Sequence, residues 1–203
     1  MQEKKSTQGL NLPDYQKIEG DYRHAFSYHP MNVKIARAEG VYIFDDEGNR
    51  YFDVSGGPFS VNLPQNHPRM KAAITKQLDK YAFTHPALAD PLRAGYSRKL
   101  SEITPGNLDH IYLVSGGSEA VETALKIARQ TQISRGHRDK YKIVSLHDSY
   151  HGMTLATMAA SGSPGAHRSF MPMLPKWPHI RQYSDFDRPE GVSREEWGIT
   201  CAN

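Results

Sequence analysis

Two short runs of β-branched and aromatic residues lie near the start of the chain, at residues 41–44 and 51–54. The polar residues 45–50 between them include Asp-Asp and Gly-Asn pairs, which are typical of turns. This pattern predicts a β-hairpin with a loop of several residues. The first thirty residues are polar with scattered aromatic side chains, and we expect them to form an arm that packs against another part of the protein.

Beyond the hairpin, apolar residues recur at the helical period, at Met70, Ile74, Leu78 and Tyr81. Pro68 suits the first turn of this helix, because its missing N–H would be unpaired there in any case. A second helix is expected over residues 88–103, and the following Pro105-Gly106 ends it.

From residue 111 onwards, short apolar runs each lead through a turn into a helical pattern. The runs cover residues 111–114 and 142–146, and we expect strands that are buried on both faces. Helices are expected over residues 118–130 and 153–160. This alternation predicts an α/β fold that begins a parallel sheet. After Pro164 we expect an irregular stretch with no closing helix or strand, so the chain is expected to end part-way through a domain.

The composition is that of a globular protein on the polar side: 203 residues, 38% hydrophobic and 23% charged, with a mean hydropathy of -0.64. It excludes a collagen-like chain, a disordered acidic tail and a disulfide scaffold. No apolar stretch approaches the roughly 18 residues of a membrane helix, and the polar start does not resemble a secretory signal. The single Cys201 fits a reducing compartment, so we expect a cytoplasmic protein. The net charge of +3 is dispersed along the chain, which does not favour nucleic-acid binding.

The turn Ser115-Gly116-Gly117-Ser118 stands between a predicted strand and a predicted helix. Its glycines allow another group to approach the backbone, and Ser118 is expected to cap the helix. Free N–H groups, a hydroxyl and the positive end of the helix dipole together favour an anion, most commonly a phosphate. A plain turn capped by serine is the alternative. A nucleophile elbow at Ser118 is weaker, because the turn lacks the last glycine of G-x-S-x-G and no acid–histidine pair follows it.

A second turn, Ser149-Tyr150-His151-Gly152, follows the next predicted strand. An aromatic ring at the end of a strand can stack on a flat cofactor, while the alternative is a capped turn with a half-buried tyrosine. His147 and His151 are four residues apart, as zinc ligands can be. The glutamate of H-E-x-x-H and a third ligand are missing, so no metal site is expected. Trp177 and Trp197 are expected to be packing residues.

The two turns together resemble those of the class-III aminotransferases, which are pyridoxal-phosphate enzymes of fold type I. Residues 115–129 and 149–152 carry the resemblance, and it extends upstream to residues 38–48 and to parts of 55–68. The resemblance implies the N-terminal part of such an α/β fold. Residues 1–65 would be an arm and a small-domain hairpin segment, and residues 66–203 the truncated beginning of the large cofactor-binding domain.

The resemblance also implies roles for individual residues. Gly116, Gly117 and Ser118 would hold the phosphate of pyridoxal 5'-phosphate. Tyr150 would stack on its pyridine ring, and His151 would lie beside that ring and help to shape the pocket. The roles of the Ser-Gly-Gly-Ser turn and of Tyr150 agree with what the residue types suggest by themselves.

Phe59 falls where the family places an aromatic residue of the substrate pocket, although Pro64-Gln65 departs from the family pattern nearby. The lysine that forms a Schiff base with the cofactor, and the aspartate that pairs with the pyridine nitrogen, are expected beyond the end of this chain. Lys126 is expected to face away from the Ser-Gly-Gly-Ser turn on its helix. The strand-end context of the Schiff-base lysine is missing around Lys140, Lys142 and Lys176.

The implied function is transfer of an amino group from an amino acid, an ω-amino acid or an amine to a 2-oxo acid such as pyruvate. The complete enzyme is expected to be a homodimer, and the 203-residue chain alone is expected to be inactive. The open alternatives are a non-catalytic fragment, one half of a split enzyme, and a related aminomutase or racemase.

Overall fold

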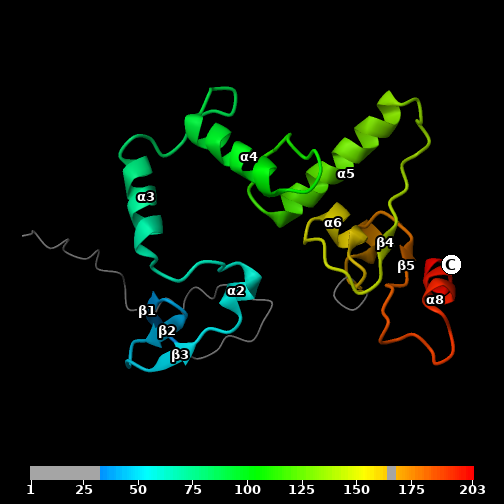
Figure 1. The fold of residues 1–203 in the computed structure, drawn as a ribbon, viewed down its shortest axis with the longest axis horizontal. Coiled ribbons are helices and arrows are strands. Elements are labelled where there is room, and N and C mark those ends of the chain that lie inside the picture. The colour runs from blue at the N-terminus through cyan, green and yellow to red at the C-terminus, as the bar shows by residue number, and fades with distance from the viewer. Residues whose placement is uncertain (1–32, 164–167) are drawn as a thin grey trace, which may run out of the picture. The chain divides into compact units, whose positions relative to one another are not determined.

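The computed structural model describes residues 33–163 and 168–203, and Figure 1 traces the helices and strands along the chain. The expected N-terminal arm lies outside these residues. The chain divides into two compact units, Met1–Ala89 and Asp90–Asn203. The division expected after residue 65 concerns the domains of a complete enzyme, and it stays a prediction.

The first unit contains a three-stranded antiparallel sheet in the order β1-β2-β3. The strands are β1 (Ile35–Glu39), β2 (Tyr42–Asp45) and β3 (Arg50–Phe52). Tyr42 pairs with Phe52 across the β2–β3 hairpin, so the hairpin expected from the sequence is confirmed. The sequence does not predict β1, because Ile-Ala-Arg-Ala-Glu contains only one β-branched residue.

Asp45 organises the loop of this hairpin. Its carboxylate accepts hydrogen bonds from the N–H of Asn49 (2.8 Å) and of Glu47 (3.1 Å), and from the Asn49 side-chain amide (2.9 Å) and the Tyr51 hydroxyl (2.8 Å). These donors stabilise the charged carboxylate, the Asn49 amide most of all, and they lower the pKa of Asp45. The bond to Asp45 also raises the pKa of Tyr51, because the carboxylate holds the hydroxyl proton.

Two helices follow the sheet in the first unit. The short helix α2 (Gly56–Phe59) begins with Gly56 and Gly57, both at positive φ, whereas α3 (Pro68–Leu78) begins with a proline as predicted. α3 ends at Leu78, before Tyr81, and none of its residues is buried within the described part of the chain.

The second unit begins with two longer helices. α4 (Pro91–Ile103) starts after Asp90, whose carboxylate accepts hydrogen bonds from the N–H groups of Leu92 (2.8 Å) and Arg93 (3.2 Å). The helix predicted from about residue 88 to residue 103 is therefore confirmed with a later start, because the cap is at Asp90. α5 (Gly117–Ser134) extends beyond the predicted 118–130 at both ends.

The parallel sheet expected in this unit is one short pair of strands. β4 (Ser145–Leu146) and β5 (His179–Ile180) run parallel, with Ser145 opposite His179. Residues 111–114 form no strand, and Tyr112 is 74% exposed, so the prediction of a buried strand is wrong. A strand requires hydrogen bonds to a neighbour, and the described residues provide none for this segment.

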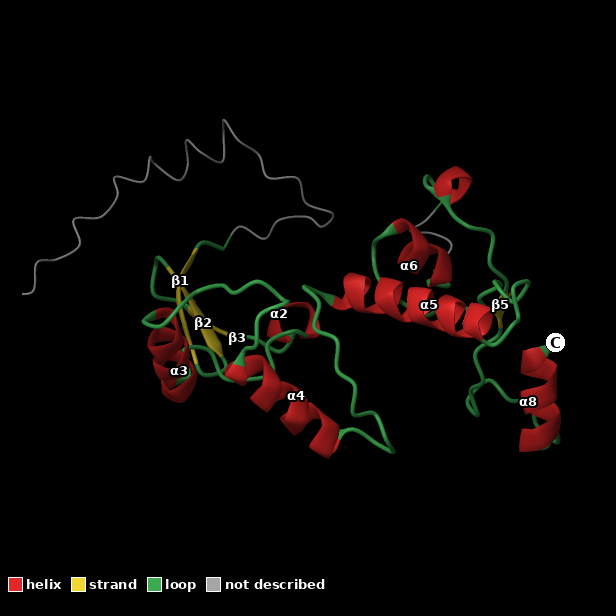
Figure 2. Cartoon of the chain, turned by 90° about the horizontal axis from the view of Figure 1, so that it is seen from above, coloured by secondary structure: helices red, strands yellow, loops and turns green. Residues whose placement is uncertain are grey.

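A small core surrounds α6 (Leu155–Ala160), which packs beside α5 (Figure 2). The buried positions are consecutive and run from Thr157 to Gly162. α6 confirms the helix expected over residues 153–160, with a later start. The stretch after it contains the 3₁₀ turn η1 (Met171–Met173), in agreement with the irregular segment predicted there.

The last element is α8 (Arg194–Ala202), so the expectation of no closing helix is wrong. Ser193 and Glu196 form a capping box: the N–H of Glu196 donates to Ser193 Oγ (3.2 Å), and the N–H of Ser193 donates to the Glu196 carboxylate (2.9 Å). Trp197 and Cys201 are buried, and Trp197 Nε1 donates to the carbonyl of Ser184 (2.9 Å). The packing role expected for Trp197 is confirmed. Among the helices that the structure describes, none combines the length and the apolar character needed to cross a membrane.

Candidate functional site

The structure brings the two predicted turns of the second unit together. The glycine turn (residues 115–118) leads into α5, and the tyrosine turn (residues 149–152) follows β4. The hydroxyl oxygen of Ser118 accepts a hydrogen bond from the N–H of Met153 at 3.1 Å, although the two residues are 35 positions apart. This hydrogen bond therefore brings together segments from separate parts of the sequence.

Gly116 is the N-cap of α5, so the prediction that Ser118 caps this helix is wrong. Ser118 lies within the first turn, and its oxygen contacts Met153 instead. Gly116 is extended, with φ of -166°, and no side chain caps the turn. The first N–H groups of a helix have no partner within it, so this uncapped end retains donors for an anion.

The backbone of the glycine turn is open on one side. A Cβ added to Gly117 would meet no atom within 4 Å, whereas a Cβ added to Gly116 would lie 3.0 Å from Oε2 of Glu119. The Glu119 carboxylate therefore lies next to Gly116, and an anion has room over Gly117. Hydrogen bonds from the turn to an anion would each contribute roughly 1.5–3 kcal/mol and would act against repulsion by this carboxylate.

Gly152 allows the two turns to come into close contact. It is buried and has a φ of +132°, a conformation that residues with a side chain rarely adopt. A Cβ at this position would lie 2.5 Å from Ser118 Oγ and 2.7 Å from the hydroxyl oxygen of Thr157. Both the backbone conformation and the close approach therefore require glycine here.

A second hydrogen bond joins the two segments one helical turn further along α5. The hydroxyl of Thr154 donates to Oε1 of Glu122 at 2.7 Å. The hydroxyl of the fully buried Thr157 lies 2.8 Å from that of Thr154. α5 and the segment after the tyrosine turn are thus joined at two points.

The aromatic residue of the tyrosine turn is accessible. Tyr150 is 72% exposed, which leaves its ring open to another planar group. The N–H of the half-buried His151 donates to Ser161 Oγ at 2.8 Å, and the Ser161 hydroxyl donates to the carbonyl of Thr157 at 2.9 Å. These bonds fix the backbone of the turn to the end of α6.

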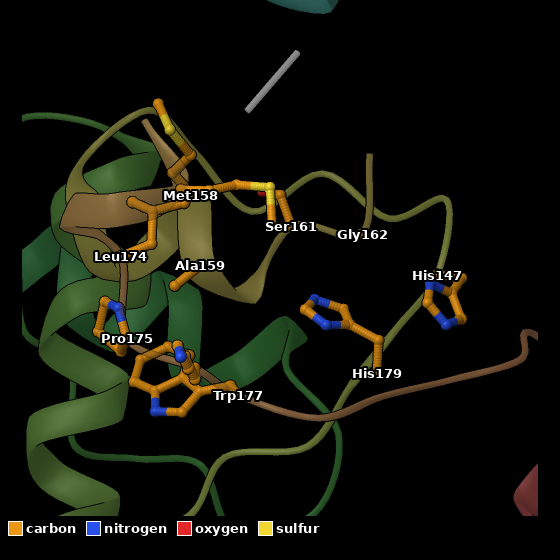
Figure 3. A pocket seen from close by; sticks show the side chains of 11 residues that line it. His147, Met158, Ala159, Ser161, Gly162, Leu174, Pro175, Trp177 and His179 are labelled. Carbon is orange, nitrogen blue, oxygen red and sulfur yellow. The ribbon is translucent and has the colours of Figure 1, made fainter. Parts of the chain in front are cut away.

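His147 precedes the tyrosine turn and lines a cavity next to it. Its ring stacks on that of His179, with the centroids 5.5 Å apart and the planes at 29° (Figure 3). The two rings line a cavity of about 280 Å³ whose wall also includes Met158, Lys176 and Trp177. In residues 33–163 and 168–203, no group of three or more His, Cys, Asp or Glu side chains is arranged to hold a metal ion.

Ser118 lacks the surroundings of a catalytic nucleophile. Its oxygen accepts a hydrogen bond from a backbone N–H, and within the described residues no histidine is hydrogen-bonded to it. The serine-hydrolase alternative therefore finds no support. Phe59 belongs to the first unit, at the end of α2, and is 91% exposed; its place in a substrate pocket stays a prediction.

Comparisons with known proteins agree with one another. The family model described as aminotransferase class-III matches residues 24–198. A putrescine aminotransferase of Pectobacterium atrosepticum is 36% identical over 138 residues, which are 68% of this chain and 29% of that protein. An ornithine aminotransferase of a Geobacillus species is 34% identical over 153 residues, 74% of this chain and 38% of that protein.

Among solved structures, an (S)-enantioselective omega-transaminase from Thermomicrobium roseum matches with a TM-score of 0.80 and 31% sequence identity. The match covers 92% of this chain and 43% of that structure. The mixed α/β fold is therefore part of the fold of that transaminase, and the chain spans less than half the length of these relatives.

Proposed function

The chain belongs to the class-III aminotransferases, and from this we propose that it carries the part of the active site that binds pyridoxal 5'-phosphate. The family match over residues 24–198 includes both turns. The hydrogen bond between Ser118 and Met153 carries the proposal, because it joins an anion-binding helix end to a turn with an exposed aromatic ring. A molecule with a phosphate at one end and a planar ring at the other would contact both turns.

The glycine turn would hold the phosphate. The N–H groups at the start of α5 point out of the helix end without partners inside it. The oxygen of Ser118 already accepts the N–H of Met153, so its own proton is free to go to a phosphate oxygen. Gly116 and Gly117 carry no side chain, and the open space over Gly117 gives the phosphate access to the backbone.

The tyrosine turn would hold the pyridine ring. Tyr150 would cover one face of the ring and exclude water from it, with a stacking contribution of about 0.5–1.5 kcal/mol beyond area burial. His151 would lie beside the ring, on a backbone fixed by the bond to Ser161. When bound, the cofactor supplies an electron sink for breaking the C–H bond next to the amino group.

The overall reaction is a proposal about a complete enzyme, because the chain spans 29% and 38% of the two curated relatives. We assign the lysine that binds the cofactor, and the aspartate opposite its pyridine nitrogen, to the part of such an enzyme that lies outside this match. The 203-residue chain is then expected to bind the cofactor without turning over substrate. A homodimer in the cytoplasm is expected for the complete enzyme.

The proposed substrates are an ω-amino acid, amino acid or amine as donor and a 2-oxo acid such as pyruvate as acceptor. The names of the relatives support an amine-type donor, since they refer to putrescine, ornithine and omega-transamination. Phe59 is proposed to contribute to the donor pocket.

Binding of pyridoxamine 5'-phosphate and of pyridoxamine to the whole chain tests this function, because neither ligand needs the lysine. Isothermal titration should give at least about tenfold tighter binding of the phosphorylated ligand, since two or more charged hydrogen bonds depend on the phosphate. Equal affinities would contradict the proposal. Borohydride reduction after addition of pyridoxal 5'-phosphate tests the assignment of the lysine. A saturable adduct at a single lysine of this chain would overturn that assignment.

A further inference from the structure

We propose that Glu122 and Thr154 are positioning residues for the cofactor: their hydrogen bond fixes the tyrosine turn relative to the helix that begins at the glycine turn. The inference rests on the proposed function. Neither side chain needs to touch the cofactor, because the bond acts by setting the spacing between the phosphate end and the ring end of the site.

The hydrogen bond of Thr154 differs from what its position favours. Thr154 is the N-cap of α6, where a threonine hydroxyl usually accepts a hydrogen bond from the N–H two or three residues later. No such cap bond is formed, and the hydroxyl donates instead to Glu122, 32 residues earlier in the chain. The start of α6 thus lacks a side-chain cap, while the two segments of the site gain a link.

This link works together with the bond between Ser118 and Met153. Ser118 and Glu122 are one turn apart on α5, and their partners Met153 and Thr154 are consecutive residues. One bond would fix a distance and leave rotation about it, whereas two bonds in a row also fix an angle. Loss of the Thr154 bond therefore leaves the direction of the tyrosine turn to the packing of α6 beside α5, while Ser118 keeps its contact.

The two ends of the site respond differently to this loss. Inorganic phosphate contacts only the glycine turn, so its affinity does not depend on where Tyr150 lies. Pyridoxamine 5'-phosphate contacts both turns and loses affinity when Tyr150 is displaced. A general loss of structure would weaken both ligands, and this difference separates positioning from a merely structural role.

The test uses the whole chain with Thr154→Val, which removes the hydroxyl at nearly constant volume, and Thr154→Ser, which restores it. Thr200→Val is the matched control, since the Thr200 hydroxyl donates only within α8. We expect Thr154→Val to weaken binding of pyridoxamine 5'-phosphate about fivefold to tenfold, as for one lost hydrogen bond to a charged group. The induced circular dichroism of bound pyridoxamine 5'-phosphate should decrease. The affinity of the variant for inorganic phosphate should stay within about twofold of that of the unaltered chain. Thr154→Ser should restore both signals.

Glu122→Ala removes the same bond from the other side but keeps the contact between the hydroxyls of Thr154 and Thr157. Its combination with Thr154→Val should therefore be no worse than Thr154→Val alone. Unchanged binding of pyridoxamine 5'-phosphate by Thr154→Val would overturn the inference, as would an equal loss for inorganic phosphate. If the unaltered chain did not prefer pyridoxamine 5'-phosphate to pyridoxamine, the proposed function would fail first. If the unaltered chain preferred pyridoxamine 5'-phosphate but Thr154→Val bound it equally well, only the positioning role would be overturned.

Discussion

The hydroxyl oxygen of Ser118 accepts the N–H of Met153 at 3.1 Å, and Gly152 lies against the same oxygen without a Cβ between them. The contact orients the Ser118 hydroxyl, because its oxygen is engaged and its proton points elsewhere. In the proposed site that proton goes to a phosphate oxygen. One hydrogen bond thus orients the Ser118 hydroxyl and joins the two halves of the proposed site.

Ser118→Ala is expected to weaken binding of pyridoxamine 5'-phosphate about tenfold or more, because a charged hydrogen bond is lost together with the link to Met153. Binding of pyridoxamine, which has no phosphate, should change little. Isothermal titration of both ligands measures the effect. Ser134→Ala, at the other end of α5, is the control and should bind both ligands as the unaltered chain does. An equal loss for both ligands would speak against a phosphate contact at Ser118.

Gly152→Ala should destabilise the second unit by about 1–3 kcal/mol, the usual effect of forcing extra volume into a packed site. The added Cβ would lie 2.5 Å from Ser118 Oγ and would push that side chain away from Met153. Urea unfolding measures the stability. Gly106→Ala is the control for backbone strain, because Gly106 also has a positive φ (68°) but no atom within 4 Å of an added Cβ. If the two variants lost equal stability, the close contact with Ser118 would not contribute to the destabilisation.

The β2–β3 hairpin should lose stability in acid through Asp45. Hydrogen bonds from Asn49 and Tyr51 hold the pKa of Asp45 below its ordinary value of 3.8, so the stabilisation is present above that pH. It is lost as the pH falls through the lowered pKa, when the carboxyl is protonated and accepts fewer hydrogen bonds. Amide hydrogen exchange of the hairpin against pH measures this loss. In Asp45→Asn, the hairpin amides should exchange faster at neutral pH, and their exchange should depend less on acid. The control Asp46→Asn changes an exposed neighbour and should keep the loss of protection in acid.

The capping box should account for much of the stability of α8. Glu196→Ala removes the acceptor for the Ser193 N–H, and loss of a cap interaction costs about 0.5–2 kcal/mol. Glu195→Ala is the matched control, because Glu195 also carries a negative charge in the first turn but is not part of the box. Hydrogen exchange of the α8 amides compares the two variants. The predicted order is faster exchange in Glu196→Ala, and the reverse order would show that charge near the helix start matters more than the box.

Local features of this chain are predictable from the sequence. The turn residues between Asp45 and Arg50 predict the hairpin, and the glycine turn after an apolar run predicts a following helix, which begins at Gly117 and not at Ser118. The box of Ser193 and Glu196 is equally local, so α8 could also have been predicted. In each case the decisive hydrogen bonds join residues only a few positions apart.

Features that depend on distant residues are not predictable in the same way. Residues 111–114 have the composition of a strand, but pairing requires a neighbour that their own sequence does not specify. Ser118 suits a cap by type, yet its oxygen contacts Met153, and the position of Met153 depends on how α5 and α6 pack. The bond between Glu122 and Thr154 depends on the same packing.

The central claim is that the two turns bind the two ends of one molecule. Backbone amide NMR of the labelled chain tests it most directly, by comparing shifts on addition of inorganic phosphate and of pyridoxamine 5'-phosphate. Phosphate should shift the amides of Gly117, Ser118 and Glu119 alone. Pyridoxamine 5'-phosphate should shift these amides and also those of Tyr150 and His151, at one common saturating concentration. If pyridoxamine 5'-phosphate shifted the amides of only one of the two turns, or of neither, the claim would be contradicted.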